Sequence, residues 1–407
     1  MKNMKIVSAK WLFDGEEIHR DKAVAFEERI EAVDTKERLC ALFPDAKVTE
    51  GGMRSLLMPG LINPHVHLEF GANRTQLRYG DFMEWLKSVI DRRDELVDAC
   101  KARCYKEQIE QMLQVGITTF GAVSSYGLEM KACKAAPQRV VFFSEAIGSQ
   151  PAAVDALYAD FMQRLEESRK LADERFIPAA AIHSPYSVHP VLAKRILSET
   201  NDLPLSAHFM ESPAEKEWLE SGSGPFKHFF ENFLGQSTPL CFPEEFLQLL
   251  NGRRTLLTHA VQADDNLLEM VADAGHTVTH CPRSNRLLGC GRLRLERLDE
   301  LDIPWLLGTD GLSSNTSLSL WDEMRAALML HYRADANLLA KRVLRATTAA
   351  AADALGIEAG RIRKGAFADI VTLELPSPVE SSEDLPLQLL LHVQEAEKVY
   401  IAGERVR

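Results

Sequence analysis

The chain has 407 residues, of which 46% are apolar and 26% charged, and its formal net charge is −12. This composition is ordinary for a soluble enzyme, and the length fits one barrel-sized domain with an accessory unit. The acidic balance argues against general binding to nucleic acid or to an anionic membrane surface. The start lacks a signal-peptide core and no apolar run approaches the roughly 20 residues that span a bilayer, so we expect a cytoplasmic protein.

Both ends of the chain read as short strands separated by turns. Residues 5–7, 23–26 and 30–33 are expected strands near the start, and residues 370–373 and 399–403 are expected near the end. The two ends flank a middle of a different character. We therefore predict one small composite β-sandwich domain formed by residues 1–56 and 365–407.

The middle of the chain alternates short apolar runs with long helical patterns, which is typical of βα units and a parallel sheet. Helical patterns cover, for example, residues 91–114, 153–172 and 319–330. The expected strands are residues 57–63, 117–123, 139–143, 177–182, 203–207, 255–258, 276–279 and 304–308. Eight such strands close a TIM barrel, so residues 57–364 are predicted to form a (β/α)8 domain of the α/β class.

The seven cysteines lie at positions 40, 100, 104, 133, 241, 281 and 290, and none forms a CxxC pair. Cys100 and Cys104 are one turn apart within a helical pattern, which favours helix packing over a pair of metal ligands. We expect free thiols in a reducing compartment.

Histidines gather where the predicted barrel strands end. His65 and His67 end the first strand, and alternation along a strand places both side chains on the same face. The later strands end at His183, His208, His259 and Asp310. Since barrel enzymes carry their chemistry at the carboxyl ends of the strands, we expect these side chains to form one site.

The motifs PGLINPHVH, HFME, THAV, HCPRSN and GTDG follow one another over essentially the whole chain. In this order they resemble the amidohydrolase superfamily, in its deaminase and chlorohydrolase branch. The resemblance implies a metal-bearing (β/α)8 barrel on a composite β-sandwich. It also implies that one divalent metal is held by His65, His67, His208 and Asp310.

Zinc suits imidazole and carboxylate ligands, and iron(II) fits the same set. Binuclear relatives use a carbamylated lysine on the fourth strand to bridge two metals. Residues 177–183 read IPAAAIH and contain no lysine. We therefore expect one metal, Zn2+ or Fe2+, per chain.

The resemblance also implies catalytic roles for three residues. Glu211 lies three residues past His208 and would shuttle protons, protonating a ring nitrogen of the substrate. His259 would orient the attacking water, and Asp310 would accept its proton while touching the metal.

Other residues suggest a substrate that is a purine nucleoside. In nucleoside deaminases of this branch, a glutamate in a context like that of Glu84 and Trp85 binds ribose hydroxyls. His183 would contact the purine or the sugar. A helix-decorating role for Glu84 and a core role for Trp85 have about equal weight.

A basic loop points to an anionic group on the substrate. Residues 283–297 read RSNRLLGCGRLRLER and follow the seventh strand. We expect Arg283, or else Arg286, to pair with a carboxylate; Arg74 and Arg78 are weaker candidates. A purine nucleoside that carries a carboxylate fits both features. The resemblance implies an adenine nucleoside joined to a benzoate, whose deamination gives the 6-oxo purine.

Several alternatives stay open at this point. A deaminase of adenosine, S-adenosylhomocysteine or methylthioadenosine needs no arginine for a benzoate. A free-base deaminase or triazine-type chlorohydrolase needs no sugar ligand at Glu84, and a cyclic amide hydrolase would want the bridging lysine. A noncatalytic binding protein would have no need of the intact metal set and Glu211. The sequence leaves the oligomeric state open and allows a homo-oligomer.

Overall fold

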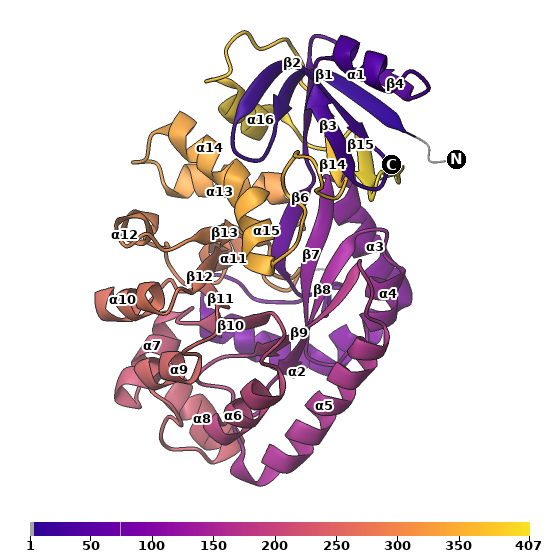
Figure 1. Ribbon diagram of the computed structural model, residues 1–407. Coiled ribbons are helices and arrows are strands. Elements are labelled where there is room, and N and C mark those ends of the chain that lie inside the picture. Colours follow the sequence, from indigo (N-terminus) through magenta and orange to yellow (C-terminus); the bar gives the residue numbers. More distant parts are fainter. Residues whose placement is uncertain (1–3, 74) are drawn as a thin grey trace.

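The computed structural model describes residues 4–73 and 75–407, and its strands form two eight-stranded sheets. One sheet is built from both ends of the chain, and the other comes from the middle (Figure 1). Helices cover the outside of the second sheet. This arrangement confirms the predicted class, a (β/α)8 barrel with an additional β-structure.

The barrel sheet runs in chain order from β6 to β13, and every neighbouring pair is parallel. Its strands are β6 (Leu61–Val66), β7 (Ile117–Ser124), β8 (Arg139–Ala146), β9 (Phe176–Ile182), β10 (Leu205–Phe209), β11 (Thr255–His259), β12 (Thr277–His280) and β13 (Trp305–Leu307). The end of β13 returns to β6, because the amide of Asp310 donates to the carbonyl of His65 over 3.2 Å. Each of the eight predicted runs contributes a strand to this sheet, although the first run also includes part of another strand.

The first predicted strand is in fact two strands that belong to different sheets. β5 (Ser55–Pro59) pairs with β14 in the terminal sheet, and β6 starts the barrel after Gly60. A Cβ at Gly60 would lie 2.0 Å from Oγ1 of Thr118, so only glycine fits at this crossing. The prediction of one strand over residues 57–63 was wrong because it joined the apolar residues on both sides of Pro59-Gly60, where the chain changes sheets.

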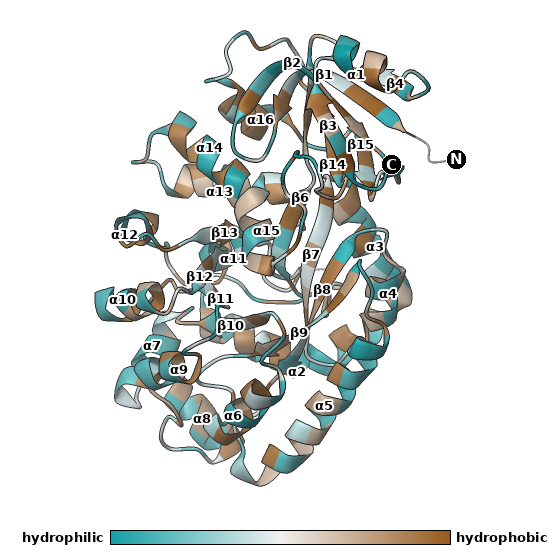
Figure 2. Cartoon of the chain, viewed as in Figure 1, coloured by the Kyte–Doolittle hydropathy of each residue, from teal (hydrophilic) through white to brown (hydrophobic). Residues whose placement is uncertain are grey.

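The helices lie between the strands and around the barrel. Figure 2 shows α5 banded along its length by hydrophilic and hydrophobic residues, as expected for a helix with one face on the barrel. The helices are α1 (Lys36–Leu42), α2 (Phe82–Ala99), α3 (Ala102–Gln114), α4 (Met130–Ala135), α5 (Val154–Lys170), α6 (Pro190–Glu199), α7 (Pro213–Ser221), α8 (Pro225–Leu234), α9 (Pro243–Leu249), α10 (Asp265–Asp273), α11 (Pro282–Leu287), α12 (Leu295–Glu300), α13 (Leu320–Leu330), α14 (Ala336–Ala346), α15 (Ala349–Leu355) and α16 (Leu385–His392), with a short 3-10 turn at Pro151–Ala153.

The predicted helix over residues 91–114 is interrupted. α2 ends at Ala99 and α3 begins at Ala102, with Lys101 in an extended conformation between them. Cys100 and Cys104 form a disulfide across this break, with a Cα–Cα distance of 5.2 Å. The expectation of free thiols was therefore wrong for this pair, because periodicity alone could not reveal the bend that brings the two residues together. The other five cysteines are free.

The terminal sheet runs in the order β16-β15-β14-β5-β1-β2-β3, and β4 adds to β1. Phe26 of β2 and Tyr400 of β15 are in edge-to-face contact at 5.3 Å although three strands separate theirs, so the sheet curls around its own core. Domain limits at residues 56 and 365 stay a prediction. The strands of the terminal sheet are β1 (Lys5–Phe13), β2 (Ile18–Phe26), β3 (Ile30–Asp34), β4 (Lys47–Glu50), β5, β14 (Ile370–Glu374), β15 (Lys398–Ile401) and β16 (Glu404–Arg405).

A buried ion pair joins the two sheets. Nε of Arg139, at the start of β8, donates to Asp369 over 2.6 Å, and both side chains are 1% exposed. The other carboxylate oxygen of Asp369 accepts the amide of Ala402 over 2.7 Å. The guanidinium also covers the ring of Phe367 at 3.4 Å. The contact fixes the barrel against the terminal sheet.

Within residues 4–73 and 75–407, no helix has both the length and the apolar character needed to cross a bilayer.

Candidate active site

The residues expected to form the site come together at the carboxyl ends of the barrel strands. His65 lies in β6, His208 in β10 and His259 at the end of β11. His67 follows β6 directly, and Asp310 follows β13. Four of these five residues are buried, and the side chain of the fifth, His67, is partly exposed at 17%. The structure thus gathers residues from four different strand ends, far apart in the chain, into one cluster.

Three imidazoles form the centre of the cluster. Nε2 of His67 lies 3.2 Å from Nε2 of His208, and the donor atoms of His65, His67 and His208 all lie within 4.8 Å of one another. The Oδ1 atom of Asp310 lies 3.8 Å from Nε2 of His65 and 3.9 Å from Nε2 of His67. The four predicted metal ligands therefore converge on one point.

The nitrogen chemistry of the cluster fits a cation. Nε2 of His65 is buried and has no hydrogen-bond partner among the described residues, while its Nδ1 lies 3.2 Å from Oγ1 of Thr258. Nδ1 of His208 donates to the carbonyl of His183 over 3.0 Å, so Nε2 of His208 keeps a free lone pair. Burial and the neighbouring imidazoles hold the pKa of His65 and His208 well below the usual value. Neutral imidazoles with outward hydrogen bonds of this kind are typical metal ligands.

Asp310 supplies a negative charge to the same point. Burial alone would raise its pKa, but the imidazoles of His67 and His65 hold the pKa of the carboxyl below its ordinary range. Its Oδ2 accepts from the hydroxyls of Ser284 and Ser314, each over 2.7 Å. Its Oδ1 accepts the amide of Gly311 over 2.8 Å. The carboxylate is therefore ionised and fixed in orientation.

Glu211 and His259 lie beside this cluster. Oε1 of Glu211 is 3.6 Å from Nε2 of His259, and the two groups form a triad with Asp310. Nδ1 of His259 is 2.8 Å from the side-chain oxygen of Asn285, which sets the direction of the ring. Burial, with the charges of Asp310 and Glu215, raises the pKa of Glu211 well above its usual value. Glu211 can therefore hold a proton near neutral pH and give it up.

Several strands enter the site through unusual backbone conformations. Met210, His259, Ala260 and Asp310 have φ angles of 48°, 77°, 49° and 57°. Such left-handed residues other than glycine carry strain that the surrounding structure must overcome, and they cluster at functional sites. Here they turn the chain sharply at the ends of β10, β11 and β13, which points Glu211, His259 and Asp310 toward each other.

Sequence reasoning missed the residues that hold the site in place. Glu215 accepts the amides of Glu211 and Met210 over 2.6 and 3.0 Å, and so fixes the sharp turn after β10. The pattern Ser212-x-x-Glu215, which starts α7, is a helix-start signal that could have drawn attention to it. Ser284 and Asn285 lie in the HCPRSN motif, which was noted without a role for either. Glu145, 1% exposed and 3.6 Å from Nδ1 of His208, gave no signal in the sequence.

The predicted substrate-binding residues have different surroundings. His183 lies next to His208, with ring centroids 4.8 Å apart, and burial lowers its pKa to about 3. Its Nδ1 is 2.6 Å from the hydroxyl of Ser187. Trp85 donates from its indole nitrogen to the carbonyl of Ser313 over 2.8 Å. Glu84 is exposed and forms an ion pair with Arg78 at 2.8 Å.

Arg283 does not have the free guanidinium that a substrate carboxylate would need. Its Nε donates to Glu323 over 2.7 Å, and its other nitrogens donate to Thr316 and to the hydroxyl and carbonyl of Ser317. Glu323 is fully buried, so this pairing links α11 to α13. The spacing of arginines in the sequence could not show that the guanidinium of Arg283 forms an ion pair with a buried acid on a distant helix.

Arg286, the second choice for the substrate carboxylate, is exposed. It has no ion pair or side-chain hydrogen bond with the parts of the chain that the structure describes. Arg74, a weaker choice, lies outside the described residues.

Comparisons with known proteins agree with this architecture. The model of the amidohydrolase family matches residues 56–406. Aminodeoxyfutalosine deaminase of a Nitratiruptor species is 45% identical over 403 residues, covering 98% of this chain and 99% of the relative. The crystal structure of Helicobacter pylori aminofutalosine deaminase with methylthio-coformycin superposes with a TM-score of 0.93 at 32% identity, covering 99% of this chain and 100% of the other.

A third match carries a metal. The crystal structure of an adenosine deaminase from Xanthomonas campestris with bound zinc has a TM-score of 0.80 at 25% identity, covering 98% of this chain and 92% of the other. Together with the family match, which spans nearly the whole chain, these similarities identify the family of the protein. The chain belongs to the amidohydrolase family.

Proposed function

We propose that the protein is a metal-dependent deaminase that converts the 6-amino group of a purine nucleoside to the 6-oxo form and releases ammonia. The observation that carries this proposal is the convergence of His65, His67, His208 and Asp310 beside the pair of Glu211 and His259. A ligand cluster next to a proton-holding carboxyl provides what hydrolytic deamination requires: an activated water and an acid for the ring nitrogen.

One divalent cation, zinc or iron(II), is held by the three imidazoles and Asp310. Bound there, it supplies the Lewis acidity that makes water nucleophilic at neutral pH. The unpartnered Nε2 of His65 and the lone pair on His208 support this ligand set. A single metal is expected because β9 offers no lysine to bridge a second one.

The protein's own residues move the protons. Glu211, protonated because it is buried, donates to a purine ring nitrogen and makes the adjacent carbon electrophilic. His259, whose ring is directed by Asn285, orients the attacking water, and the ionised Asp310 accepts its proton. A second proton transfer to the amino group lets ammonia leave.

The substrate we propose is 6-amino-6-deoxyfutalosine, which joins an adenine nucleoside to a benzoate. The product is futalosine, and the reaction belongs to the futalosine route to menaquinone. Support comes from the similarity, over nearly the full length, to the deaminase from Nitratiruptor and from the close superposition on the Helicobacter pylori aminofutalosine deaminase. Glu84 and His183 remain the proposed contacts of the sugar and the purine, and Trp85 that of the nucleoside.

Arg286, in place of Arg283, is the proposed contact of the benzoate carboxylate. Ser284 and Asn285, which precede Arg286 in α11, bond to Asp310 and His259, so the helix lies against the site. The carbonyl of Leu287 accepts the amide of Gly80, which brings the loop before Glu84 to the same helix. An exposed guanidinium without an acidic partner is suited to a carboxylate.

A comparison of substrates tests the proposed function. Zinc-loaded protein is assayed for ammonia release from aminodeoxyfutalosine, adenosine, methylthioadenosine and S-adenosylhomocysteine. The proposal expects the highest kcat/KM for aminodeoxyfutalosine. A preference for one of the other nucleosides would contradict the substrate and keep the reaction class, whereas no ammonia from any of the four would contradict both.

A further inference from the structure

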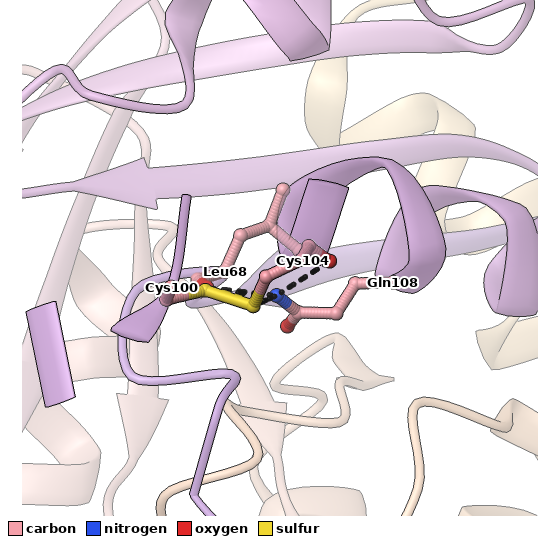
Figure 3. The surroundings of a disulfide bond; sticks show 4 residues. All are labelled: Leu68, Cys100, Cys104 and Gln108. Atoms are coloured by element: carbon pink, nitrogen blue, oxygen red, sulfur yellow. Dashed lines mark hydrogen bonds between the residues drawn. A yellow bond between two sulfur atoms is a disulfide. The ribbon is translucent and has the colours of Figure 1, made fainter. Parts of the chain in front are cut away.

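The bridge between Cys100 and Cys104 lies against the loop that follows the ligand His67 (Figure 3). The contact is made by Gln108, on the next turn of α3. Its side-chain nitrogen donates to the carbonyl of Leu68 over 2.9 Å. The same nitrogen lies 3.4 Å from the sulfur of Cys104 and 3.7 Å from that of Cys100. One amide group therefore contacts both the bridge and the residue next to His67.

The loop has no room to shift while Gln108 stays in place. A Cβ built on Gly71 would lie 2.0 Å from the side-chain nitrogen of Gln108, so the backbone of the loop is in direct contact with that amide. Leu68 is fully buried, and the neighbouring Glu69 accepts the amides of Ser125 and Tyr126. The position of α3 and the position of the loop are therefore tied to each other.

Only one of the two bridged cysteines lines a cavity. Cys104 lines a cavity of about 250 Å³, whose wall also includes Lys101, Gly71 and Leu312. Cys100 is 2% exposed and does not line it. Lys101 is exposed and has no ion pair with any residue in the described ranges, so it adds an unpaired positive charge to the lining.

We propose that Cys100–Cys104 is a thiol-exchange site that takes small anionic thiols through this cavity, and that opening the bridge releases the loop after His67. A thiolate attacks Sγ of Cys104, forming a mixed disulfide, and the S–S bond breaks with the electron pair going to Cys100. A second thiol attacks the sulfur of the first, giving the small-molecule disulfide and the Cys104 thiolate. Both cysteines then take protons from water, so two thiols are oxidised and one protein disulfide is reduced.

The local sequence explains why the loop would respond. Residues 91–114 carry a continuous helical pattern, yet the chain bends between α2 and α3 where the bridge holds it. Without the bridge, the pattern favours one helix through residues 100 and 101. Joining the helices would move Gln108 away from Leu68 and leave the carbonyl of Leu68 without this donor.

Native alkylation tests the exchange. Protein purified without reductant is incubated with glutathione, which carries two carboxylates, labelled with iodoacetamide and mapped by mass spectrometry. New labels are expected at Cys100 and Cys104, while the partly exposed Cys40 serves as a label that is present throughout. Labels at both positions before reduction, even after treatment with oxidised glutathione, or none after reduction would overturn the proposal.

Charge substitutions test whether the thiol reaches the bridge through the cavity. Lys101→Glu should slow the reaction with glutathione by about fivefold and leave that with uncharged 2-mercaptoethanol unchanged, because a charge in the cavity lining acts only on the charged thiol. Lys106→Glu, a control on α3 away from the cavity lining, should affect neither. Equal slowing by the two variants would contradict attack through the cavity.

Hydrogen exchange tests the link to the loop. Amides of residues 68–73 should exchange faster in the reduced protein than in the oxidised one, and the Cys104→Ser variant should match the reduced wild type. Identical exchange in all three forms would show that the bridge does not control the loop.

Discussion

At the scale of single residues, the site combines a cluster suited to a cation with a carboxyl, that of Glu211, whose pKa burial raises. His65 and His67 could be predicted because alternation along a strand places them on one face. The role of Arg283 could not, because its partner Glu323 lies on a helix far along the chain. Pattern reveals which residue types follow a strand, whereas the partner of a long side chain depends on packing between distant helices.

Glu211→Gln tests the proton transfer. The amide keeps the size of the side chain but cannot give up the proton, so turnover should fall by about 10² to 10⁴-fold. Metal content, measured on the same preparation, should stay that of the wild type because Glu211 is not a proposed ligand. Activity near the wild-type level would remove Glu211 from the mechanism.

Arg286→Met tests the contact to the benzoate. Losing a charge-assisted contact of roughly 2 kcal/mol should lower kcat/KM for aminodeoxyfutalosine by about 30-fold. Adenosine and methylthioadenosine, which lack the carboxylate, should be little affected.

Arg283→Met is the matched control for Arg286→Met. It leaves Glu323 buried without its partner, so it should lower the free energy of unfolding and change all substrates alike. A selective loss in Arg283→Met instead of Arg286→Met would reverse the two assignments.

At the scale of secondary-structure elements, periodicity identified the eight barrel strands and failed at two junctions. Apolar residues lie on both sides of Pro59-Gly60, where β5 ends and β6 begins, and a helical pattern continues through the bend at Cys100. In both places periodicity predicts one continuous element, and a contact that periodicity does not reveal interrupts it. These contacts are the crossing of Gly60 over Thr118 and the bridge to Cys104.

A histidine immediately before β12 should make stability depend on pH. His276 is fully buried, neither ring nitrogen has a partner in the described parts of the chain, and burial lowers its pKa from 6.5 to about 4. Between these two values the unfolded chain binds more protons than the folded one. Stability is therefore lost as pH falls from about 6.5 to about 4.

His276→Leu should flatten this dependence. Denaturant unfolding at several pH values within this window gives the free energy of unfolding as a function of pH. The slope of this curve should be smaller for the variant than for the wild type, by up to the equivalent of one bound proton. His228→Leu, on the surface of α8, is the control and should keep the wild-type slope. Parallel curves for His276→Leu and the wild type would contradict a neutral buried imidazole.

At the scale of the whole molecule, the barrel and the terminal sheet are joined at the end opposite to the site. The buried pair of Arg139 and Asp369 lies at this junction. The sequence predicted that both ends of the chain would form one unit. It could not predict this contact, because neither residue stands in a recognisable motif.

Asp369→Ala should destabilise the chain by about 3 to 5 kcal/mol, since it leaves the guanidinium of Arg139 buried without its partner. Chemical denaturation measures the loss. The double variant Arg139→Met with Asp369→Ala should be less destabilised than the sum of the single variants. Simple additivity would mean that the two side chains do not act as a pair.

The central claim is that one metal, held by His65, His67, His208 and Asp310, enables deamination of a 6-aminopurine nucleoside. It is tested by titrating metal-free protein with zinc while following ammonia release from aminodeoxyfutalosine. The account predicts no activity without metal and a linear rise that ends at one equivalent per chain. Full activity in the metal-free protein, or a rise that continues to two equivalents, would contradict it.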